Sequence, residues 1–352
     1  MLQASTTISV ERAPILLAEV CEHYGEHGTV AFDGRSGTIR TPYGEAFVTA
    51  EGETIRLAIT ARDKVGLSYM KIGLSEHLAE MSAFPISSSG WEGDGNEQDL
   101  PFFRVMTVTR SQRLSPHMQR VTLTGGDLAG FANAGLHVRL VFPPRGRTPV
   151  WPRLASNGRI AWPEGEDAVT ARVYTLRRVD RAAGLVDIDI VLHPGASTPG
   201  SNFAETARPG DIVGVMGPGG DGVPPSRSLF LFGDETALPA IARILEELPQ
   251  EASAQAVVEV DGPADMLTLT SRARTHVRYI DRQGAPAGTT GLLAEAARAL
   301  TRQDVGETGY IWAGCEFNDF KAIRSFVRGT LQVPKDRHLV VAYWRRGQAG
   351  TD

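Results

Sequence analysis

The pattern of hydrophobic and polar positions changes twice along the chain. In the first part, apolar side chains recur at helical spacing over residues 12–24 and 62–81. Between these helices, residues 54–60 alternate apolar and polar side chains, which is typical of a half-buried strand. We therefore predict a small α+β domain over residues 1–83. Small and polar residues are frequent in the next stretch, residues 84–101, and predict a flexible linker.

The middle part has the pattern of short strands. Leu136, Val138 and Leu140 alternate with their neighbours, and residues 186–193 repeat this alternation. Short alternating segments broken by glycine and proline are typical of an antiparallel β-barrel, which we place over residues 102–226. The loop after the first of these strands is long, and loops of such length are often functional or mobile.

The last part alternates strands with helices. Residues 229–232 are a continuous apolar run, as expected for a parallel strand buried on both faces. Further strands are predicted at residues 256–260, 276–280, 310–313 and 339–344, with helices after 238, over 290–300 and over 318–331. Asn318 or Asp319 is expected to cap the last of these helices. This order predicts a doubly wound α/β domain over residues 227–352 and, for the whole chain, a multidomain protein.

Composition narrows the classes of function. The 352 residues carry a formal net charge of −5, which gives no reason to expect nucleic-acid binding. The longest apolar runs are too short to span a bilayer, and the first residues lack the features of a signal peptide. We expect a cytoplasmic protein without nucleic-acid or membrane partners, and a monomer is favoured.

Cysteine and histidine positions predict no metal centre. Cys21 and Cys315 are too few for an iron–sulfur cluster and form no Cys-x-x-Cys pattern. His23, His27 and His77 lie in the first domain, but a metal site needs a convergence that spacing alone does not show. Surface or core histidines are the expectation there, and any redox chemistry is expected to come from a bound organic cofactor.

The segment Arg172-Val173-Tyr174-Thr175 carries the first candidate chemistry. On an extended strand, Arg172 and Tyr174 point to one face and Thr175 points to the other. A cation beside an aromatic ring suits a ligand with a phosphate and a ring, and a hydroxyl can bond the ring edge, which describes a flavin dinucleotide. Thr175 reaches that ring only if the strand bends or ends there. An exposed strand with ordinary surface charge is the alternative.

A second candidate is the turn that follows the next strand. Gly200 allows close approach of the backbone to an anion, and Ser201 and Asn202 add hydrogen-bond donors. Arg172, His193 and this turn are expected to converge on one pyrophosphate. As an isolated segment, the turn would be an ordinary helix cap.

A third candidate is Gly233-Asp234-Glu235-Thr236, at the end of the first α/β strand. The chain has no Gly-x-Gly-x-x-Gly fingerprint, and two carboxylates make this turn a poor phosphate cradle. Thr236 is expected to bond the nicotinamide or the flavin. Asp234 or Thr236 as a simple helix cap is the alternative.

Together, these motifs resemble those of the siderophore-interacting protein family, which comprises flavin-dependent ferric-siderophore reductases related to ferredoxin reductases. The matching marks are Arg172-Val173-Tyr174-Thr175, Leu192-His193 and residues 199–204, 209–211, 217–220, 233–240, 312–316 and 343–347. Residues 1–83 resemble a small family of unknown function that is sometimes fused to such reductases.

The resemblance implies FAD and either NADH or NADPH as cofactors, and a ferric siderophore as substrate. The implied reaction passes electrons from NAD(P)H through the flavin to ferric iron, which leaves the siderophore as ferrous iron. A general flavin reductase or diaphorase is one alternative. A siderophore- or haem-binding protein without turnover is the other.

Candidate site residues follow from the motifs and the resemblance. The candidate cofactor-binding residues are Arg172, Tyr174, Thr175, His193, Gly200, Ser201, Asn202, Phe203, Ala204, Asp234, Thr236, Ala237, Glu259, Glu316 and Tyr343. Thr175 and Trp344 are the candidate catalytic residues, with a buried tryptophan at the sheet edge as the alternative for Trp344. The candidate siderophore-binding cations are Lys335, Arg337, Arg345 and Arg346, with a solvated segment as the alternative for the first two.

Two departures and one open choice remain. The family usually has tryptophan at Phe203 and glycine at Cys315, and the bulk of Cys315 is expected to alter cofactor affinity without a catalytic role. Glu259 and Asp261 suit a ribose diol and favour NADH, while two downstream arginines, Arg272 and Arg274, favour a 2′-phosphate. NADH is slightly preferred.

Overall fold

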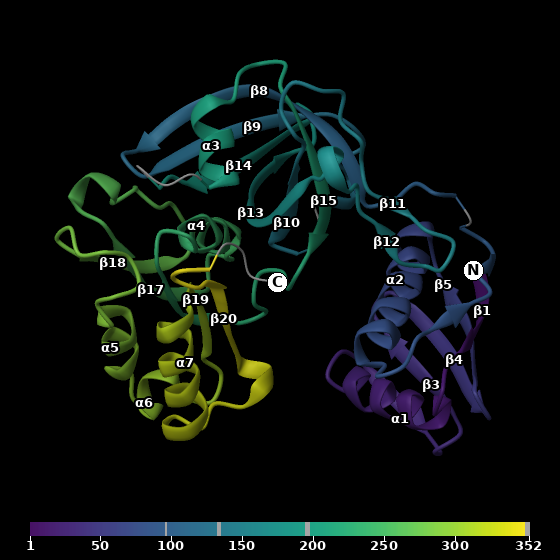
Figure 1. Cartoon of the computed structure of the whole chain (residues 1–352). Helices are drawn as coiled ribbons and strands as arrows, with labels where there is room; N and C mark the ends of the chain where they lie inside the picture. Colours follow the sequence, from purple (N-terminus) through teal and green to yellow (C-terminus); the bar gives the residue numbers. More distant parts are fainter. Residues whose placement is uncertain (96, 132–134, 194–197, 349–352) are drawn as a thin grey trace. The chain divides into compact units, whose positions relative to one another are not determined.

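The protein consists of two compact units that do not follow the order of the chain (Figure 1). The computed structural model describes residues 1–95, 97–131, 135–193 and 198–348. One unit comprises Met1–Phe103 and Pro143–Val169, and the other comprises Arg104–Phe142 and Thr170–Asp352. Each unit is described by itself.

The first unit is an antiparallel sheet with two helices packed on one face. The strand order is β2-β3-β4-β5-β1-β6, with β7 also paired to β1. The bounds are β1 Leu2–Ser9, α1 Ala13–Tyr24, β2 Thr29–Phe32, β3 Ser36–Thr41, β4 Gly44–Glu51, β5 Thr54–Ala61, α2 Lys64–Met81, β6 Ser87–Ser88 and β7 Glu92–Gly93. The helices and the inward side chains of the sheet form one core, so the predicted α+β domain is confirmed.

Strand β1 was not predicted, because its sequence is polar and lacks a clear alternation. It pairs along its whole length with β5, from Leu2 opposite Ala61 to Ser9 opposite Thr54. Ala4, Thr6 and Ile8 of β1 are buried on one face, but the small and hydroxyl side chains hide this alternation in the sequence.

Residues 84–101, predicted as a flexible linker, are instead part of the first unit. Strands β6 and β7 pair with β1. Between them, Trp91 is 8% exposed and its indole Nε1 donates to Ser75 Oγ at 3.1 Å. The small residues of this stretch therefore form turns and short strands, and the buried Trp91 attaches the stretch to α2.

The long loop predicted within the barrel, Pro143–Glu166, lies in a segment from Pro143 to Val169 that also belongs to the first unit. It contains a small antiparallel pair, β11 Arg153–Leu154 and β12 Ile160–Ala161. Gly158 has φ +84°, and a Cβ there would lie 2.2 Å from Trp91 Nε1. Only glycine permits this approach, and the barrel sequence is therefore interrupted by a segment that completes the first unit.

The second unit begins with the predicted barrel, which is closed in the order β10-β13-β14-β9-β8-β15. Its elements are β8 Phe103–Ser115, β9 Met118–Thr124, β10 His137–Phe142, β13 Thr170–Asp180, β14 Leu185–Val191, α3 Pro199–Thr206 and β15 Ile212–Gly219. Alternate side chains such as Val121, Leu140 and Ile188 fill its interior. Helix α3 packs on the barrel through Ala204, which is fully buried.

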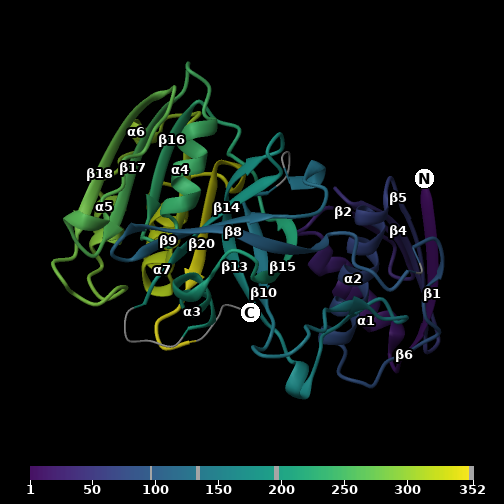
Figure 2. The ribbon, with the colours of Figure 1, turned by 90° about the horizontal axis from the view of Figure 1, so that it is seen from above.

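The remainder of the second unit is a parallel sheet in the order β18-β17-β16-β19-β20. Its elements are β16 Ser228–Gly233, α4 Leu238–Glu247, β17 Ser253–Val260, β18 Arg274–Asp281, α5 Leu292–Arg298, α6 Arg302–Val305, β19 Tyr310–Glu316, α7 Phe317–Ser325 and β20 His338–Trp344. Helix α4 covers one face, and α5 and α7 cover the other (Figure 2). Within the described residues, no helix has the length and apolar character needed to cross a membrane.

Ion pairs fix the barrel to the parallel sheet within the second unit. Arg177 of β13 makes two hydrogen bonds with Glu246 of α4, at 2.8 and 2.6 Å. Arg243 of the same helix donates to the carbonyl of Leu176 at 2.8 Å. The two bonds of a bidentate arginine–carboxylate pair restrict rotation, so β13 has a fixed position relative to the carboxyl ends of the parallel strands.

Candidate cofactor and substrate site

A cavity of about 310 Å³ lies between the barrel and the carboxyl ends of the parallel strands. Its walls are formed by His137, Val173, Tyr174, Thr175, Asp189, Val191, His193, Thr198, Ser201, Thr236, Val341, Ala342 and Tyr343. This volume is at the lower end of the range for small-molecule sites. The structure therefore brings together six predicted site residues that lie far apart in the sequence.

Strand β13 contributes consecutive residues to this cavity. Val173, Tyr174 and Thr175 all line it, although an ideal strand would point Thr175 away from Tyr174. The pairing of β13 with β14 shifts between Leu176 and Arg178. This irregularity begins one residue after Thr175, and the pairing of Tyr174 and Thr175 with β10 is regular. The contact of Thr175 with a flavin ring stays a prediction.

Two cavity-lining side chains of β13 carry hydroxyls with no partner in the described part of the chain. Neither Tyr174 Oη nor Thr175 Oγ1 has a hydrogen-bond partner among the described residues, although Thr175 is only 4% exposed. Burial raises the pKa of Tyr174 to about 12, and the nearby Arg172 guanidinium acts in the opposite direction. Because buried polar groups are normally paired, both hydroxyls are available to a ligand.

Helix α3 begins directly beside Tyr174. A Cβ on Gly200 would lie 1.6 Å from the Tyr174 hydroxyl, so glycine is required at this position. Ser201 is 2% exposed and its Oγ accepts the backbone N–H of His193 at 3.1 Å. Phe203 lies 5.1 Å from Phe142, ring to ring, and retains an aromatic contact at the barrel end.

Other candidates on the barrel side take different places. Arg172 does not line the cavity, but it forms no ion pair within the described residues and donates only to the carbonyl of Ala171, at 2.7 Å. Asn202 is half-buried in α3. Ala204 packs into the barrel core and not on the cavity.

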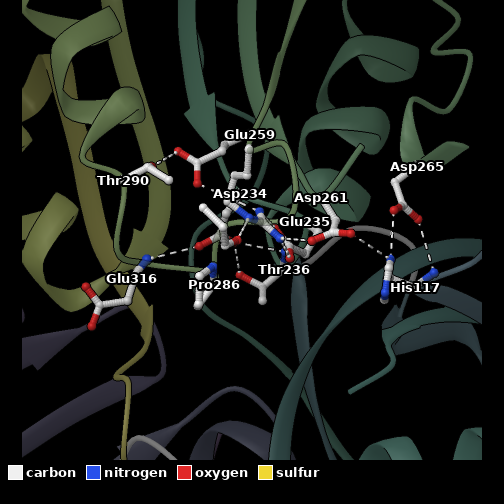
Figure 3. A network of polar contacts seen from close by, with 12 residues as sticks. His117, Asp234, Glu235, Thr236, Glu259, Asp261, Asp265, Pro286, Thr290 and Glu316 are labelled. Carbon is white, nitrogen blue, oxygen red and sulfur yellow. Dashed lines mark hydrogen bonds and ion pairs between the residues drawn. The ribbon is translucent and has the colours of Figure 1, made fainter. Parts of the chain in front are cut away.

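Asp234 connects the ends of three parallel strands instead of facing a ligand (Figure 3). Its Oδ1 accepts from the backbone N–H and the hydroxyl of Thr236. Its Oδ2 accepts from the backbone N–H of Glu316 at 3.1 Å and from Trp344 Nε1 at 2.7 Å. Burial raises the pKa of Asp234 to about 7. Asp234 thus positions Thr236, which does line the cavity, and Trp344.

Glu259 is also engaged inside the sheet domain. It is 2% exposed, accepts from Thr290 Oγ1 at 3.0 Å and lies 3.8 Å from the Arg282 guanidinium (Figure 3). Arg282 makes two hydrogen bonds of 2.8 Å with Glu235. Both Glu259 oxygens therefore have internal partners, which does not favour the predicted ribose contact. The more exposed Asp261 lies 3.6 Å from Arg282.

Glu316 caps a helix, a role that we predicted for Asn318 or Asp319. It is the N-cap of α7, and its side chain accepts from the backbone N–H of Asn318. It also accepts from the backbone N–H of Arg346 at 3.1 Å. Glu316 is only 1% exposed and holds the chain after β20, and these internal partners do not favour the predicted contact with a cofactor. The prediction placed this cap two or three residues too late because it looked only for short polar side chains.

Tyr343 meets a residue that the sequence did not suggest. Its hydroxyl lies 2.7 Å from His137 Nε2 of β10, and both side chains line the cavity. Burial lowers the pKa of His137 to about 4, so the imidazole is neutral at pH 7. His137 is a polar position of the alternating strand β10, and the alternation alone would predict that it faces solvent. Only the tertiary pairing of the barrel with β20 reveals it.

The four candidate cations lie at opposite ends of β20. Lys335 and Arg337 precede the strand, and Arg345 and Arg346 follow it. Because the strand is parallel to its neighbours, the first two lie at the amino edge of the sheet, away from Thr236 and Trp344. Arg337 also donates to the carbonyls of two glycines in a neighbouring loop. Only Arg345 and Arg346 are at the cavity end.

Two further predicted positions are fully buried. Ala237 lies in the core beneath α4, where it directly precedes the helix. Cys315 is 0% exposed in β19, and burial raises the pKa of its thiol. The thiol is therefore protonated and packed in the core between the sheet and α5 and α7.

Two family models match the second unit, one over the barrel and one over the parallel sheet. Residues 107–222 match the family described as siderophore-interacting FAD-binding domain, and residues 226–347 match the siderophore-interacting protein family. A siderophore utilization protein of T. fusca has 36% sequence identity, with a TM-score of 0.59, over 71% of this chain and 95% of that one. The chain belongs to the siderophore-interacting protein family.

Other proteins similar to this siderophore-interacting protein have lower sequence identity to it. The protein SipS from Aeromonas hydrophila is 30% identical over 72% of this chain and 93% of that one, with a TM-score of 0.59. The ferric vibriobactin reductase ViuB of Vibrio cholerae is 29% identical over 72% of this chain and 93% of its own length. A ferredoxin NADP+ reductase from Neisseria gonorrhoeae, 13% identical with a TM-score of 0.50, shares the fold.

The first domain has a separate match. Residues 5–92 match a family described as an uncharacterized protein conserved in bacteria (DUF2218). This range ends at Glu92, the first residue of β7 in the first unit. The segment from Pro143 to Val169, which completes that unit, lies outside the match.

Proposed function

We propose that this siderophore-interacting protein is an FAD-dependent NAD(P)H oxidoreductase that reduces ferric siderophores and releases ferrous iron. The observation that carries the proposal is the cavity where Tyr174 and Thr175 of the barrel face Thr236 and Tyr343 of the parallel sheet. Two domains that meet in this way suit a flavin on one side and a nicotinamide on the other. The reductase named for ferric vibriobactin is a relative across the same two domains.

The residues present fit FAD. Tyr174 Oη and Thr175 Oγ1 face the cavity without internal partners, and Arg172 is nearby without an ion pair in the described part of the chain. Arg172 would hold a phosphate, Tyr174 would pack on the isoalloxazine and Thr175 would bond the ring edge. His193, Gly200 and Ser201, at the start of α3, would hold the pyrophosphate through backbone and side-chain donors.

Bound FAD supplies two-electron exchange with NAD(P)H and one-electron exchange with ferric iron. No general acid or base is required, so the protein's tasks are positioning and exclusion of water. Thr236, held by Asp234, and Tyr343, held by the neutral His137, form the nicotinamide side. Arg345 and Arg346 provide positive charge at the same end of the sheet, which favours the approach of an anionic ferric siderophore.

The test is turnover of the purified protein with a panel of acceptors. The protein should carry a flavin spectrum and oxidise NADH or NADPH when a ferric siderophore is added, with ferrous iron trapped by a ferrous-specific chelator. Rates with free flavin, ferric citrate and protein acceptors measured in parallel separate this function from that of a general flavin reductase or diaphorase. Tight siderophore binding without NAD(P)H oxidation would contradict the proposal.

A further inference from the structure

Three histidines of the first unit lie together although the sequence separates them. His23 is in the last turn of α1, His27 follows that helix and His77 is in α2. One ring nitrogen from each lies within 4.8 Å of the others. The convergence that sequence spacing does not show is therefore present in the fold.

The backbone after α1 accounts for the first pair. Gly25 keeps helical dihedral angles, and the N–H of His27 bonds to the carbonyl of Tyr24 at 3.0 Å. This turn places His27 about one helical turn beyond His23, on the same face, and their Nε2 atoms are 3.1 Å apart. Two nitrogens bound to one zinc ion are about 3.3 Å apart in tetrahedral geometry and about 2.9 Å apart at a right angle. The pair already has the spacing of two ligands on one ion.

The third imidazole is oriented by its surroundings. The His77 ring is 4.5 Å from that of His23, and its Nδ1 lies 3.7 Å from Glu80 Oε2. In metal sites, the second ring nitrogen of a ligand histidine commonly faces a carboxylate, which fixes the ring and its tautomer. The buried ring of Tyr24 packs edge-on against His77 at 5.4 Å. A hydrogen bond between the two Nε2 atoms would explain His23 and His27, but not His77 and Glu80.

We propose that His23, His27 and His77 bind one divalent first-row transition-metal ion. Neutral imidazole nitrogen suits Zn²⁺, Cu²⁺, Ni²⁺ and Fe²⁺. Because all three nitrogens lie within 4.8 Å of one another, the largest separation must shorten by at most about 1.5 Å to match a tetrahedral ion. Side-chain rotation can supply this, because His27 is exposed and the other two are half-buried. Three ligands leave a coordination position open to water or to an exchanging ion.

The ion has two possible sources with the same chemistry. One is a resident ion from the surroundings, such as Zn²⁺, which would brace the ends of α1 and α2. The other is the ferrous ion that leaves the siderophore, and this source alone rests on the proposed reductase function. Titrations with each ion distinguish the two sources.

The experiment is equilibrium titration of the metal-stripped full chain with Zn²⁺ and, under anaerobic conditions, with Fe²⁺. We expect one Zn²⁺ per chain, with a dissociation constant on the order of micromolar or tighter. His27→Gln removes an exposed ligand with little risk to folding and is expected to weaken binding at least about tenfold. Glu80→Gln is expected to weaken it by about tenfold through the orientation of His77. His276→Gln, which removes an exposed histidine of β18, is the matched control and leaves binding unchanged.

Each outcome of the Zn²⁺ and Fe²⁺ titrations either supports or contradicts the proposed metal site. Zn²⁺ binding without Fe²⁺ binding supports the site with a resident ion, and binding of both supports the site with the released ion as a source. Equal affinity in the unmodified chain and in a His27→Gln variant with an unchanged circular dichroism spectrum would overturn the proposal, as would no binding at millimolar Zn²⁺. Because the titration needs neither NAD(P)H nor siderophore, its failure is independent of any failure of the reductase function.

Discussion

The two walls of the cavity use polar residues in opposite ways. On the barrel wall, Tyr174 and Thr175 present hydroxyls that have no protein partner among the described residues. In the parallel sheet beside the cavity, Asp234 and Glu259 do not line it and have internal partners on both oxygens. The comparison teaches that a polar residue at a strand end predicts where a site lies, but not which side chains are available to a ligand.

The difference has a physical cause. Neighbouring barrel strands satisfy one another's backbone, so a side chain such as Thr175 has no structural task at the cavity. At the carboxyl ends of parallel strands, backbone N–H groups and the Trp344 indole gather in a buried place and need acceptors. Asp234 supplies them, because leaving such donors unpaired would cost about 1–3 kcal/mol each.

The largest effect is expected for Arg172→Ala on the barrel wall. Loss of the unpaired guanidinium removes a charge-assisted contact, so the affinity for FAD should fall on the order of 10- to 100-fold. Fluorescence titration of the flavin-free protein measures this loss. Arg178→Ala is the control, because Arg178 is an exposed arginine of the same strand, paired with Asp180. Equal loss in both variants would remove the phosphate role of Arg172.

Asp234→Asn tests the sheet wall. The amide nitrogen replaces an acceptor of two N–H groups, so the free energy of unfolding should fall by about 1–3 kcal/mol. Denaturant unfolding measures it, with the exposed Asp336→Asn as control. If Asp234 contacted only a ligand, the ligand-free protein would not lose stability.

The same residue predicts a pH dependence. Burial raises the pKa of Asp234 from 3.8 to about 7, so the folded state binds more protons than the unfolded state between those values. Its contribution to stability is therefore largest at low pH and falls as the pH rises from about 4 to about 7. The stability difference between the unmodified protein and Asp234→Asn should shrink over this window. A difference that grows with pH would show that hydrogen bonding to the carboxylate outweighs burial.

A smaller effect is expected at the two ends of β20. Arg346→Ala should raise the KM for an anionic ferric siderophore a few-fold, and added salt should reduce this effect, because an exposed charge acts mainly through steering. Lys335→Ala removes an equally exposed cation at the amino edge and should leave KM unchanged. Equal effects from both would mean that overall charge, and not position, matters.

The smallest effect is expected for Glu259→Gln. A side chain that is 2% exposed and paired with Thr290 does not meet the ribose, so the ratio of NADH to NADPH turnover should change less than about twofold. Asp261→Asn should shift this ratio toward NADPH, since the Asp261 side chain is 39% exposed. A large change with Glu259→Gln would restore the ribose role predicted from the sequence.

The sequence predicts architecture well wherever side-chain period decides it. The continuous apolar run of β16 and the alternation of β10 and β5 each indicate the correct element, because the hydrophobic core imposes those periods. Strand β1 and residues 84–101 are not predicted, since backbone pairing and a single buried tryptophan, Trp91, hold them.

The candidate site is predictable in place but only partly in role. Tyr174, Thr175, His193, Ser201, Thr236 and Tyr343 all line one cavity. His137 is missed because nothing along the chain links β10 to β20. Asp234, Glu259 and Glu316 carry the residue types of ligands, but burial gives them internal partners. A sequence motif shows which residue type occupies a position. The hydrogen-bond partners of a buried carboxylate come from distant parts of the chain and cannot be inferred from the motif.

The segment from Pro143 to Val169 lies between two stretches of the second unit in the sequence but belongs to the first unit. The chain passes between the two units three times, after Phe103, after Phe142 and after Val169. A single proteolytic cut after Phe103 would therefore release Met1–Phe103 from the rest of the chain, while Pro143–Val169 of the same unit would stay covalently joined to the barrel. A gene cut at the same place would leave the first unit incomplete, because Gly158 and its neighbours would stay with the barrel and would no longer cover Trp91. The first unit is thus built from two separate stretches of sequence, so it cannot be added to the chain or removed from it at a single point.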